Sequence, residues 1–311
     1  MKNKIFQLVE STRKFVANKT IIAAVSGGKD SVYMLYVLSK ASPKRLVVAH
    51  FNHKSRPESD DDESFVKELA KKFNLPFIVE TLTTPPPTGV SVESYYREKR
   101  YEFLKNVLTS QKGNLISTAH TANDIVETFL FRLFTGRALR IPKQIDDNLF
   151  RPLYFTTTDE VLKALKYLKQ DFRVDQTNFD LRYDRNFIRK IVQDLMQRFG
   201  KRLIINTLQK AIFINKRAGG MTKVVDAFWQ SMEDRKKNVE LIKTVIEKIR
   251  DEELSLFVLA RWLYLNLGFE VGHIHCVRFR NFLNSHAKEI QFPLKKKLVK
   301  EENFLTIYEV R

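Results

Sequence analysis

Cysteine is almost missing from the sequence: Cys276 is the single one among 311 residues. One thiol cannot form an internal disulfide, and no Cys-x-x-Cys pair exists. This usage fits a reducing compartment, so we expect a cytoplasmic protein in which Cys276 is a small buried hydrophobe.

Long apolar runs are missing too. No stretch approaches the roughly 18 consecutive apolar residues that indicate a membrane span, so we predict none. The first residues, Met1 to Phe6, have neither the apolar core nor the cleavage site of a signal peptide. Internal repeats and low-complexity tracts are not found. A hydrophobic content of 43% and a length of 311 residues suit a globular protein of two domains.

Acidic residues are outnumbered by basic ones. The chain has 54 Lys and Arg against 36 Asp and Glu, which gives a formal net charge of +18. The basic residues are spread along the whole chain. They indicate a polyanionic partner, nucleic acid first and an anionic membrane surface second, with a lysine-rich proteome as the alternative explanation.

One stretch combines several anion-binding features. The apolar run 21–25 predicts a buried parallel strand, Gly27 and Gly28 predict a tight turn, and the apolar run 32–38 predicts a helix. The start of that helix offers free N–H groups to an anion. Ser26 and Ser31 add hydroxyls, Lys29 adds a cation, and Asp30 can hold a metal ion or receive a proton. The spacing fits neither the Walker loop nor the dinucleotide-binding turn.

Strands and helices alternate through the first 200 residues. Strand-like runs at 45–51, 76–80 and 114–118 alternate with helical patterns at 5–16, 60–73 and 91–104, and the stretch 119–128 enters another helix. This order predicts βαβ units, an α/β fold and a parallel sheet. Ser91 is a candidate helix N-cap, and Thr157 with Glu160 forms a capping-box pattern.

The chain changes character near residue 200. The remainder is predicted to be helical to about residue 267, with a long helical pattern around 232–249, and to end in shorter segments. We therefore predict two domains, 1–200 and 201–311, the second smaller, mainly helical and basic.

A family resemblance rests on motifs in a fixed order. Residues 26–31 resemble the Ser-Gly-Gly-x-Asp-Ser loop of the N-type ATP pyrophosphatases, which split ATP between the α and β phosphates and transfer AMP to a substrate oxygen. Further matches are His50-x-Asn52-His53-x-x-Arg56, Ser91-x-Glu93-x-x-x-Arg97-x-x-Arg100-Tyr101, His120 through Asp124 and Glu127, Arg151-Pro152-Leu153, and Asn178 through Arg185-Asn186-x-Ile188-Arg189. As a set they resemble the tRNA(Ile)-lysidine synthetase family, in its short bacterial form with one small domain after the catalytic one.

The resemblance implies an open parallel sheet with helices on both faces and a defined reaction. In that family ATP activates the wobble cytidine of a minor isoleucine tRNA, pyrophosphate leaves, and the ε-amine of L-lysine displaces AMP. The implied partners are tRNA(Ile) with a CAU anticodon and L-lysine, without a membrane; a homodimer is left open. The implied cofactors are ATP and Mg²⁺.

The resemblance also implies site residues. The ATP-binding candidates are Ala24, Ser26, Gly27, Gly28, Lys29, Asp30, Ser31, His50 and Asn52. The catalytic candidates are Asp30, Arg97, His120, Asp124 and Glu127. The substrate and tRNA candidates are His53, Arg56, Arg100, Arg185, Asn186 and Arg189. Asp30 and Asp124 are candidate Mg²⁺ ligands, while Asp124 and Glu127 are also candidates for handling the lysine amine.

Two departures and several alternatives accompany the resemblance. The family often has a histidine where Thr121 stands, and a glycine-rich stretch where residues 134–140 contain only Gly136. For each candidate histidine, the alternative to a functional role is a purely structural role. For each candidate arginine, the alternative is a position on a solvated helix face. Another ATP pyrophosphatase, amidating or sulfur-transferring, is one competing function, although sulfur transfer lacks its paired cysteines here. A non-catalytic RNA-binding protein is the other.

Overall fold

The computed structural model describes residues 1–54, 57–87, 91–135, 140–174, 184–200, 202–232 and 237–310, and gives only the backbone of Arg185 and Ala218. The chain forms two compact units. The first comprises Met1–Glu127 and Pro142–Leu208, and the second Thr128–Ile141 and Gln209–Arg311. Each is described by itself below. The assignment of functions to domains 1–200 and 201–311 stays a prediction.

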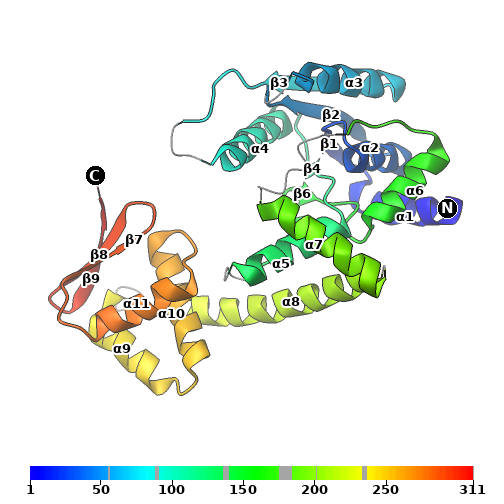
Figure 1. The fold of residues 1–311 in the computed structure, drawn as a ribbon. Helices are drawn as coiled ribbons and strands as arrows, with labels where there is room; N and C mark the ends of the chain where they lie inside the picture. The colour runs from blue at the N-terminus through cyan, green and yellow to red at the C-terminus, as the bar shows by residue number, and fades with distance from the viewer. Residues whose placement is uncertain are drawn as a thin grey trace. The chain divides into compact units, whose positions relative to one another are not determined.

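A six-stranded sheet organises the first unit, in the order β3-β2-β1-β4-β6-β5 (Figure 1). Its strands are β1 (Thr20–Ala24), β2 (Arg45–Asn52), β3 (Phe77–Thr81), β4 (Leu115–Ser117), β5 (Ile145–Asp146) and β6 (Leu149–Phe150). All neighbouring strands pair in parallel except β5 and β6, which form an antiparallel hairpin at one edge. The predicted parallel sheet is confirmed, and the short hairpin was not predicted because its strands have only two residues each.

Alternate strand residues enter two cores, because successive side chains of a strand point to opposite faces. Ile21 and Ala23 lie in a core with helices α1, α2, α3 and α6, whereas Ile22 lies in another core with α4. The predicted helices on both faces are therefore confirmed. The helices of this unit have the bounds α1 (Lys2–Val16), α2 (Lys29–Ala41), α3 (Ser59–Lys72), α4 (Val92–Ser110), α6 (Thr158–Leu168) and α7 (Asp184–Phe199).

Two helix starts follow the predicted capping chemistry. The Ser91 hydroxyl accepts from the N–H of Ser94 at the start of α4. Thr157 and Glu160 form a complete capping box at the start of α6, in which each side chain accepts from the other residue's backbone N–H. Both caps satisfy N–H groups that a helix leaves unpaired at its first turn.

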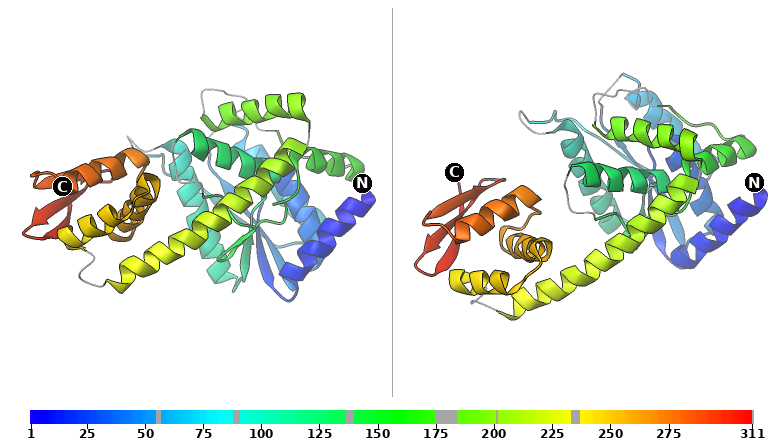
Figure 2. Two further views of the ribbon diagram at one scale, coloured as in Figure 1. Left: turned by 90° about the horizontal axis from the view of Figure 1, so that it is seen from below. Right: turned by 60° about the horizontal axis from the view of Figure 1, so that its bottom comes forward.

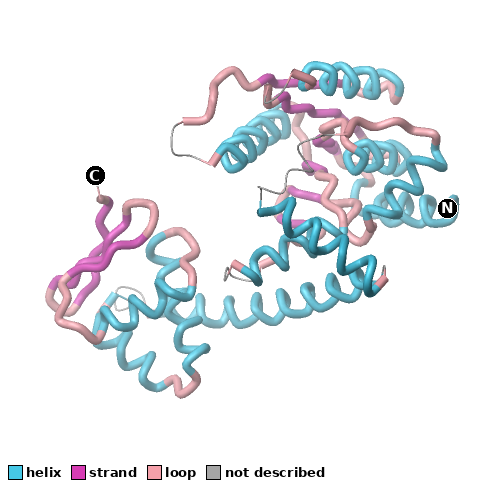
Figure 3. The backbone as a smooth tube through the Cα atoms, viewed as in Figure 1, coloured by secondary structure: helices cyan, strands magenta, loops and turns pink. Residues whose placement is uncertain are grey.

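The second unit joins helices to a small antiparallel sheet of order β7-β8-β9 (Figure 3). Its later elements are α9 (Val239–Lys248), α10 (Glu252–Leu267), α11 (His273–Leu283), β7 (Glu289–Phe292), β8 (Lys296–Glu301) and β9 (Phe304–Glu309). The helices α5 (Ala122–Phe134) and α8 (Arg202–Ser231) contribute to both units. Trp229, Trp262 and Phe279 are fully buried at its centre. Cys276 is buried as predicted, and burial raises its pKa to about 11, so the thiol stays protonated.

One helix prediction was wrong. The pattern around 232–249 is not one helix, since α8 ends at Ser231 and α9 begins at Val239. The Asn238 side chain accepts from the N–H of Leu241 and starts the new helix. The long helix of this region is instead α8, of 30 residues (Figure 2). Within the described ranges no helix is long and apolar enough to cross a membrane.

Candidate active site

The loop between β1 and α2 has the geometry that its glycines predict. Gly27 has a φ of +89°, a conformation that other residues avoid. A Cβ there would come within 3.4 to 3.5 Å of Val66, Phe65 and Arg173. Gly28 is the N-cap of α2, which begins at Lys29. The turn therefore brings the backbone directly from the strand end to the helix start.

Serine hydroxyls close this turn. The Ser31 hydroxyl donates to the carbonyl oxygen of Gly28 at 2.9 Å and accepts from the N–H of Ser26 at 3.2 Å. The Ser26 and Ser31 oxygens lie 3.2 Å apart. These hydroxyls lie at the start of a helix of 13 residues, where N–H groups and the helix dipole favour an anion. The arrangement is suited to holding phosphate oxygens.

The loop is supported from two sides. His50 of β2 lies 2.8 Å from the carbonyl oxygen of Val25 through Nδ1, and its side chain is buried. Burial lowers the pKa of His50, which keeps the ring neutral. The N–H of Arg173 donates to the carbonyl oxygen of Gly27 at 2.9 Å, and its guanidinium pairs with Asp62 of α3 at 3.0 Å. The side chain of His50 thus holds the loop, and its predicted part in nucleotide binding stays a prediction.

Asp30 carries one oxygen that is paired and one that is not. Its Oδ2 lies 2.6 Å from Nζ of Lys29, whereas the buried Oδ1 has no hydrogen-bond partner among the described residues. Burial raises the pKa of Asp30, Lys29 opposes this, and the charge of Asp124 adds to it. A carboxylate oxygen of this kind fits a divalent cation, for which oxygen is the preferred ligand. The described residues contain no cluster of three or more acidic, histidine or cysteine ligands.

The start of α5 uses a second capping box. Oδ2 of Asp124 accepts from the N–H and the hydroxyl of Thr121, both at 2.8 Å, and the N–H of Asp124 donates back to that hydroxyl at 3.4 Å. Thr121 occupies the position where the family often has histidine, and here it fixes the helix start. His120 is half-buried and lies 3.0 Å from the Thr118 hydroxyl through Nδ1. This contact orients the imidazole beside the strand end.

Glu127 lies one turn further along α5. Its side chain is buried, and Oε1 lies 3.4 Å from Nε of Arg189 on α7. The Arg189 guanidinium also reaches the Asn186 side-chain oxygen at 3.4 Å. These contacts bring together two motifs more than fifty residues apart in the sequence and hold the Glu127 carboxylate opposite a cation.

Residues at the end of β2 form a separate group. The Asn52 amide donates to Asp60 at 3.1 Å and to Glu63 at 2.9 Å, so its side chain fixes the start of α3. The His53 ring lies 4.9 Å from the Phe51 ring and 5.0 Å from the Tyr96 ring. Burial, with a smaller effect of Arg100, lowers the pKa of His53 to about 4. His53 is therefore neutral and aromatic in character at neutral pH.

Two arginines of α4 share one tyrosine. The guanidinium of Arg97 lies 5.0 Å from the centre of the Tyr101 ring, and that of Arg100 lies 5.9 Å from it. Arg97 is exposed and Arg100 half-buried. The ring holds both cations on one face of the helix, where they can meet phosphates.

The candidate residues are thus distributed over several elements of the first unit. The carboxyl ends of β1, β2 and β4 lie at one edge of the sheet, where ligands bind in open α/β folds. Arg56 lies outside the described residues, as does the side chain of Arg185. Arg173 was missed, because its contacts with Gly27 and Asp62 join residues more than a hundred positions apart. No local sequence signal could have indicated them.

Arg151 is buried and belongs to the Arg151-Pro152-Leu153 motif, for which no function is predicted from the sequence. Its Nη1 donates to the carbonyl oxygen of Lys143 at 2.6 Å, and burial lowers its pKa. It anchors the β5–β6 hairpin.

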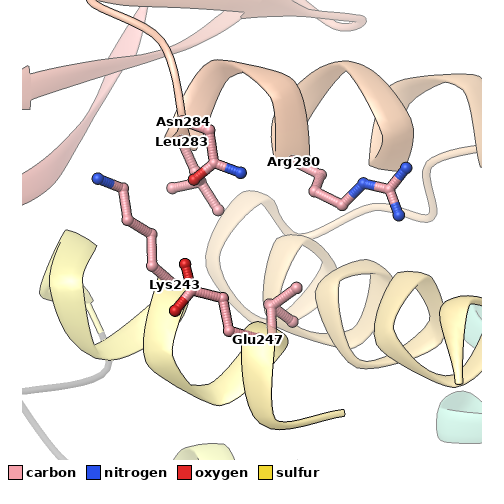
Figure 4. Close-up of a pocket in the computed structure, with 6 residues that line it drawn as sticks. Lys243, Glu247, Arg280, Leu283 and Asn284 are labelled. Carbon is pink, nitrogen blue, oxygen red and sulfur yellow. The ribbon is translucent and has the colours of Figure 1, made fainter. Parts of the chain in front are cut away.

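In the second unit, a cavity of about 20 Å³ lies between α9 and α11, lined by Lys243, Glu247, Arg280 and Asn284 among others (Figure 4). It has room for one water molecule and not for a nucleotide.

Comparison with known proteins shows the family. Residues 1–196 match the model of the PP-loop domain family. The tRNA(Ile)-lysidine synthase of Petrotoga mobilis is 32% identical over 210 residues, covering 64% of this chain and 67% of that protein. That of Caldanaerobacter subterraneus is 30% identical over 326 residues, covering 99% of this chain and 69% of that protein. The chain belongs to the tRNA(Ile)-lysidine synthase branch of the PP-loop family.

Coverage and fold complete the comparison. The chain spans 60% of two further tRNA(Ile)-lysidine synthases, both from Thermotoga. The solved structure of U34-tRNA thiolase NcsA from Methanococcus maripaludis matches with a TM-score of 0.60 at 15% identity, covering 69% of this chain and 79% of that one. This likeness supports the fold. The family membership makes ATP the expected nucleotide at the loop of residues 26–31.

Proposed function

We propose that the protein ligates L-lysine to the wobble cytidine of the CAU anticodon of tRNA(Ile), using ATP, in a reducing cytoplasm. The observation that carries the proposal is the loop between β1 and α2, in a chain similar along 99% of its length to a tRNA(Ile)-lysidine synthase. Its two hydroxyls and its helix start suit a pyrophosphate leaving group. The reaction then forms a C–N bond between the lysine ε-amine and the cytosine ring as AMP leaves.

The first half-reaction is the transfer of AMP to the cytidine. Ser26, Ser31 and the N–H groups of the turn donate to the pyrophosphate, and Arg97 and Arg100 lie on one helix face to meet phosphates. Asp30 would hold a Mg²⁺ ion, which would neutralise the charge that develops on the leaving pyrophosphate. Asp124 lies close enough to raise the pKa of Asp30. His120 is placed to hydrogen-bond phosphate or substrate.

The second half-reaction is the attack of lysine. Its ε-amine is protonated in water and becomes nucleophilic only when it loses this proton. We assign its binding and deprotonation to Glu127. This carboxylate lies one turn beyond Asp124 on the same helix, α5. The ion pair with Arg189, at 3.4 Å, holds it in place.

The tRNA contacts extend over the basic surface. His53 and Tyr96 present aromatic rings. The other tRNA candidates belong to the two motifs that the family resemblance assigns to substrate; they are Arg56, Arg185, Asn186 and Arg189. The basic second unit would hold the tRNA body through its phosphates. The target base has to leave its stack to reach the loop.

The decisive experiment measures labelled lysine transfer and ATP–pyrophosphate exchange with bulk bacterial tRNA. We expect ATP-dependent incorporation of lysine and of no other amino acid. Asp30→Asn should abolish exchange and transfer, because the neutral amide is a poor cation ligand. Asp171→Asn, the same substitution at an exposed position, serves as the control. Pyrophosphate exchange without any lysine transfer in the wild type would show that the nucleophile is a molecule other than lysine.

Glu127→Gln separates the two half-reactions. We expect exchange within about threefold of the wild type and lysine transfer reduced about 100-fold or more, since general-base catalysis typically contributes about 10²- to 10⁴-fold. Asp124→Asn should lower both rates. Equal loss of exchange and transfer in Glu127→Gln would contradict the assignment of Glu127 to the amine.

A further inference from the structure

Lys29 makes an unusual contact for its position. Adjacent residues on a helix do not face each other, yet Nζ of Lys29 lies 2.6 Å from Oδ2 of the neighbouring Asp30. Both side chains are largely covered, with 31% and 26% of their surface exposed. This is therefore not a fully solvated surface pair.

The ammonium contacts Oδ2 of the same carboxylate whose unpaired Oδ1 is the candidate oxygen for a divalent ion. A divalent ion on Asp30 would lie within a few ångströms of Nζ, and like charges at that distance repel strongly in a partly covered site. The two cations also compete for the carboxylate oxygens. As long as Lys29 stays on Asp30, the affinity of the carboxylate for a divalent ion is reduced.

A nucleotide changes this balance. Its phosphates carry more negative charge than one carboxylate, and they would lie against the hydroxyls of Ser26 and Ser31, next to Lys29 in the same turn. The lysine side chain is flexible and its ammonium acts as a point charge, so it can move from Asp30 to a phosphate without disturbing the helix.

We propose that Lys29 is a resident counter-ion that keeps Asp30 closed to divalent cations until the phosphates of a bound nucleotide draw the ammonium away. The ion then enters with the nucleotide, not before it. The inference rests on the proposed function only in taking Asp30 as the cation ligand.

The test measures Mn²⁺ binding to the full-length protein by electron paramagnetic resonance, without tRNA or lysine. In the free protein, Lys29→Met should bind Mn²⁺ about tenfold more tightly than the wild type, whereas Lys29→Arg should not differ from it. With a non-hydrolysable ATP analogue present, the affinities of Lys29→Met and the wild type should differ by less than about twofold.

Two controls make the result specific. Lys40→Met removes the same charge from the exposed other end of α2, where the lysine lies over the Tyr36 ring, and should leave Mn²⁺ binding unchanged. In an Asp30→Asn background, Lys29→Met should not increase the affinity for Mn²⁺. Thermal unfolding of each variant checks that it is folded.

Equal Mn²⁺ affinity of Lys29→Met and the wild type would overturn the proposal, and so would an equal gain in Lys40→Met. Failure here and failure of the proposed function are distinguishable. If the protein transfers no lysine but its Mn²⁺ affinity depends on Lys29, the counter-ion proposal stands and the proposed function fails. If it transfers lysine and its Mn²⁺ affinity does not depend on Lys29, the proposed function stands and the counter-ion proposal fails.

Discussion

At the scale of residues, burial decides which side chains keep their usual chemistry. His53 stands at the end of a strand, between the rings of Phe51 and Tyr96, and its pKa is lowered to about 4. In the unfolded chain the same group titrates near 6.5. Its position in the sequence is that of a candidate ligand, whereas its surroundings make it a neutral aromatic ring.

This difference predicts a pH dependence of stability. The unfolded state binds a proton at His53 as the pH falls below about 6.5, and the folded state does so only near 4. The stabilisation is fully present above pH 6.5 and is lost as the pH falls to 4. His53→Phe, which keeps the ring, should remove about 1 to 3 kcal/mol of the stability loss between pH 7 and pH 4. Urea unfolding at both pH values measures it, and identical pH profiles would contradict it.

At the scale of elements, the structure uses one device twice. Thr121 with Asp124 caps α5, and Thr157 with Glu160 caps α6. Only the first pair includes a candidate catalytic residue. The second pair is therefore a matched control for the first.

Thr121→Ala and Thr157→Ala should each destabilise the protein by about 1 kcal/mol, because each leaves a first-turn N–H without its acceptor. Pyrophosphate exchange should fall about tenfold or more in Thr121→Ala alone, since the Asp124 carboxylate loses the hydroxyl bond and keeps only the backbone bond of residue 121. Chemical unfolding and exchange assays measure the two effects. Equal activity of the two variants would show that Asp124 does not need this support.

The elements also show what a sequence can and cannot predict. The strands β1 to β4 were predictable because apolar runs, turn residues and helix periodicity are local signals. Gly27 was predictable at the turn, since few residues adopt a φ of +89°. Arg173 was not, because its contacts with Gly27 and Asp62 depend on how distant segments pack. The break between α8 and α9 was missed, although the six polar residues 233–238 interrupt the apolar pattern and the side chain of Asn238 caps the new helix.

At the scale of the whole molecule, charge is the dominant feature. The net charge is +18, and basic residues occur in both units. In the second unit, β8 begins at Lys296 and includes Lys297 and Lys300. Lys296 and Lys297 form exposed ion pairs with Glu309 and Glu289. Lys300 instead donates to carbonyl oxygens at the end of α11, so it stabilises that helix terminus and is less available to a ligand. The charge on the surface is therefore smaller than the count of lysines suggests.

The remaining surface charge predicts how tRNA binding responds to salt. Each phosphate that the protein neutralises releases counter-ions, and single-stranded or duplex segments both follow this rule. Contact with only two phosphates already predicts about a tenfold loss of affinity between 50 and 200 mM salt, and we expect at least this loss. Filter binding of tRNA across that range, without ATP, measures the slope. Lys296→Gln with Lys297→Gln should lower the slope, and Lys300→Gln, the same change at a residue that caps a helix, should leave it unchanged while lowering stability. A flat response would exclude tRNA binding through phosphates, which the net charge indicates.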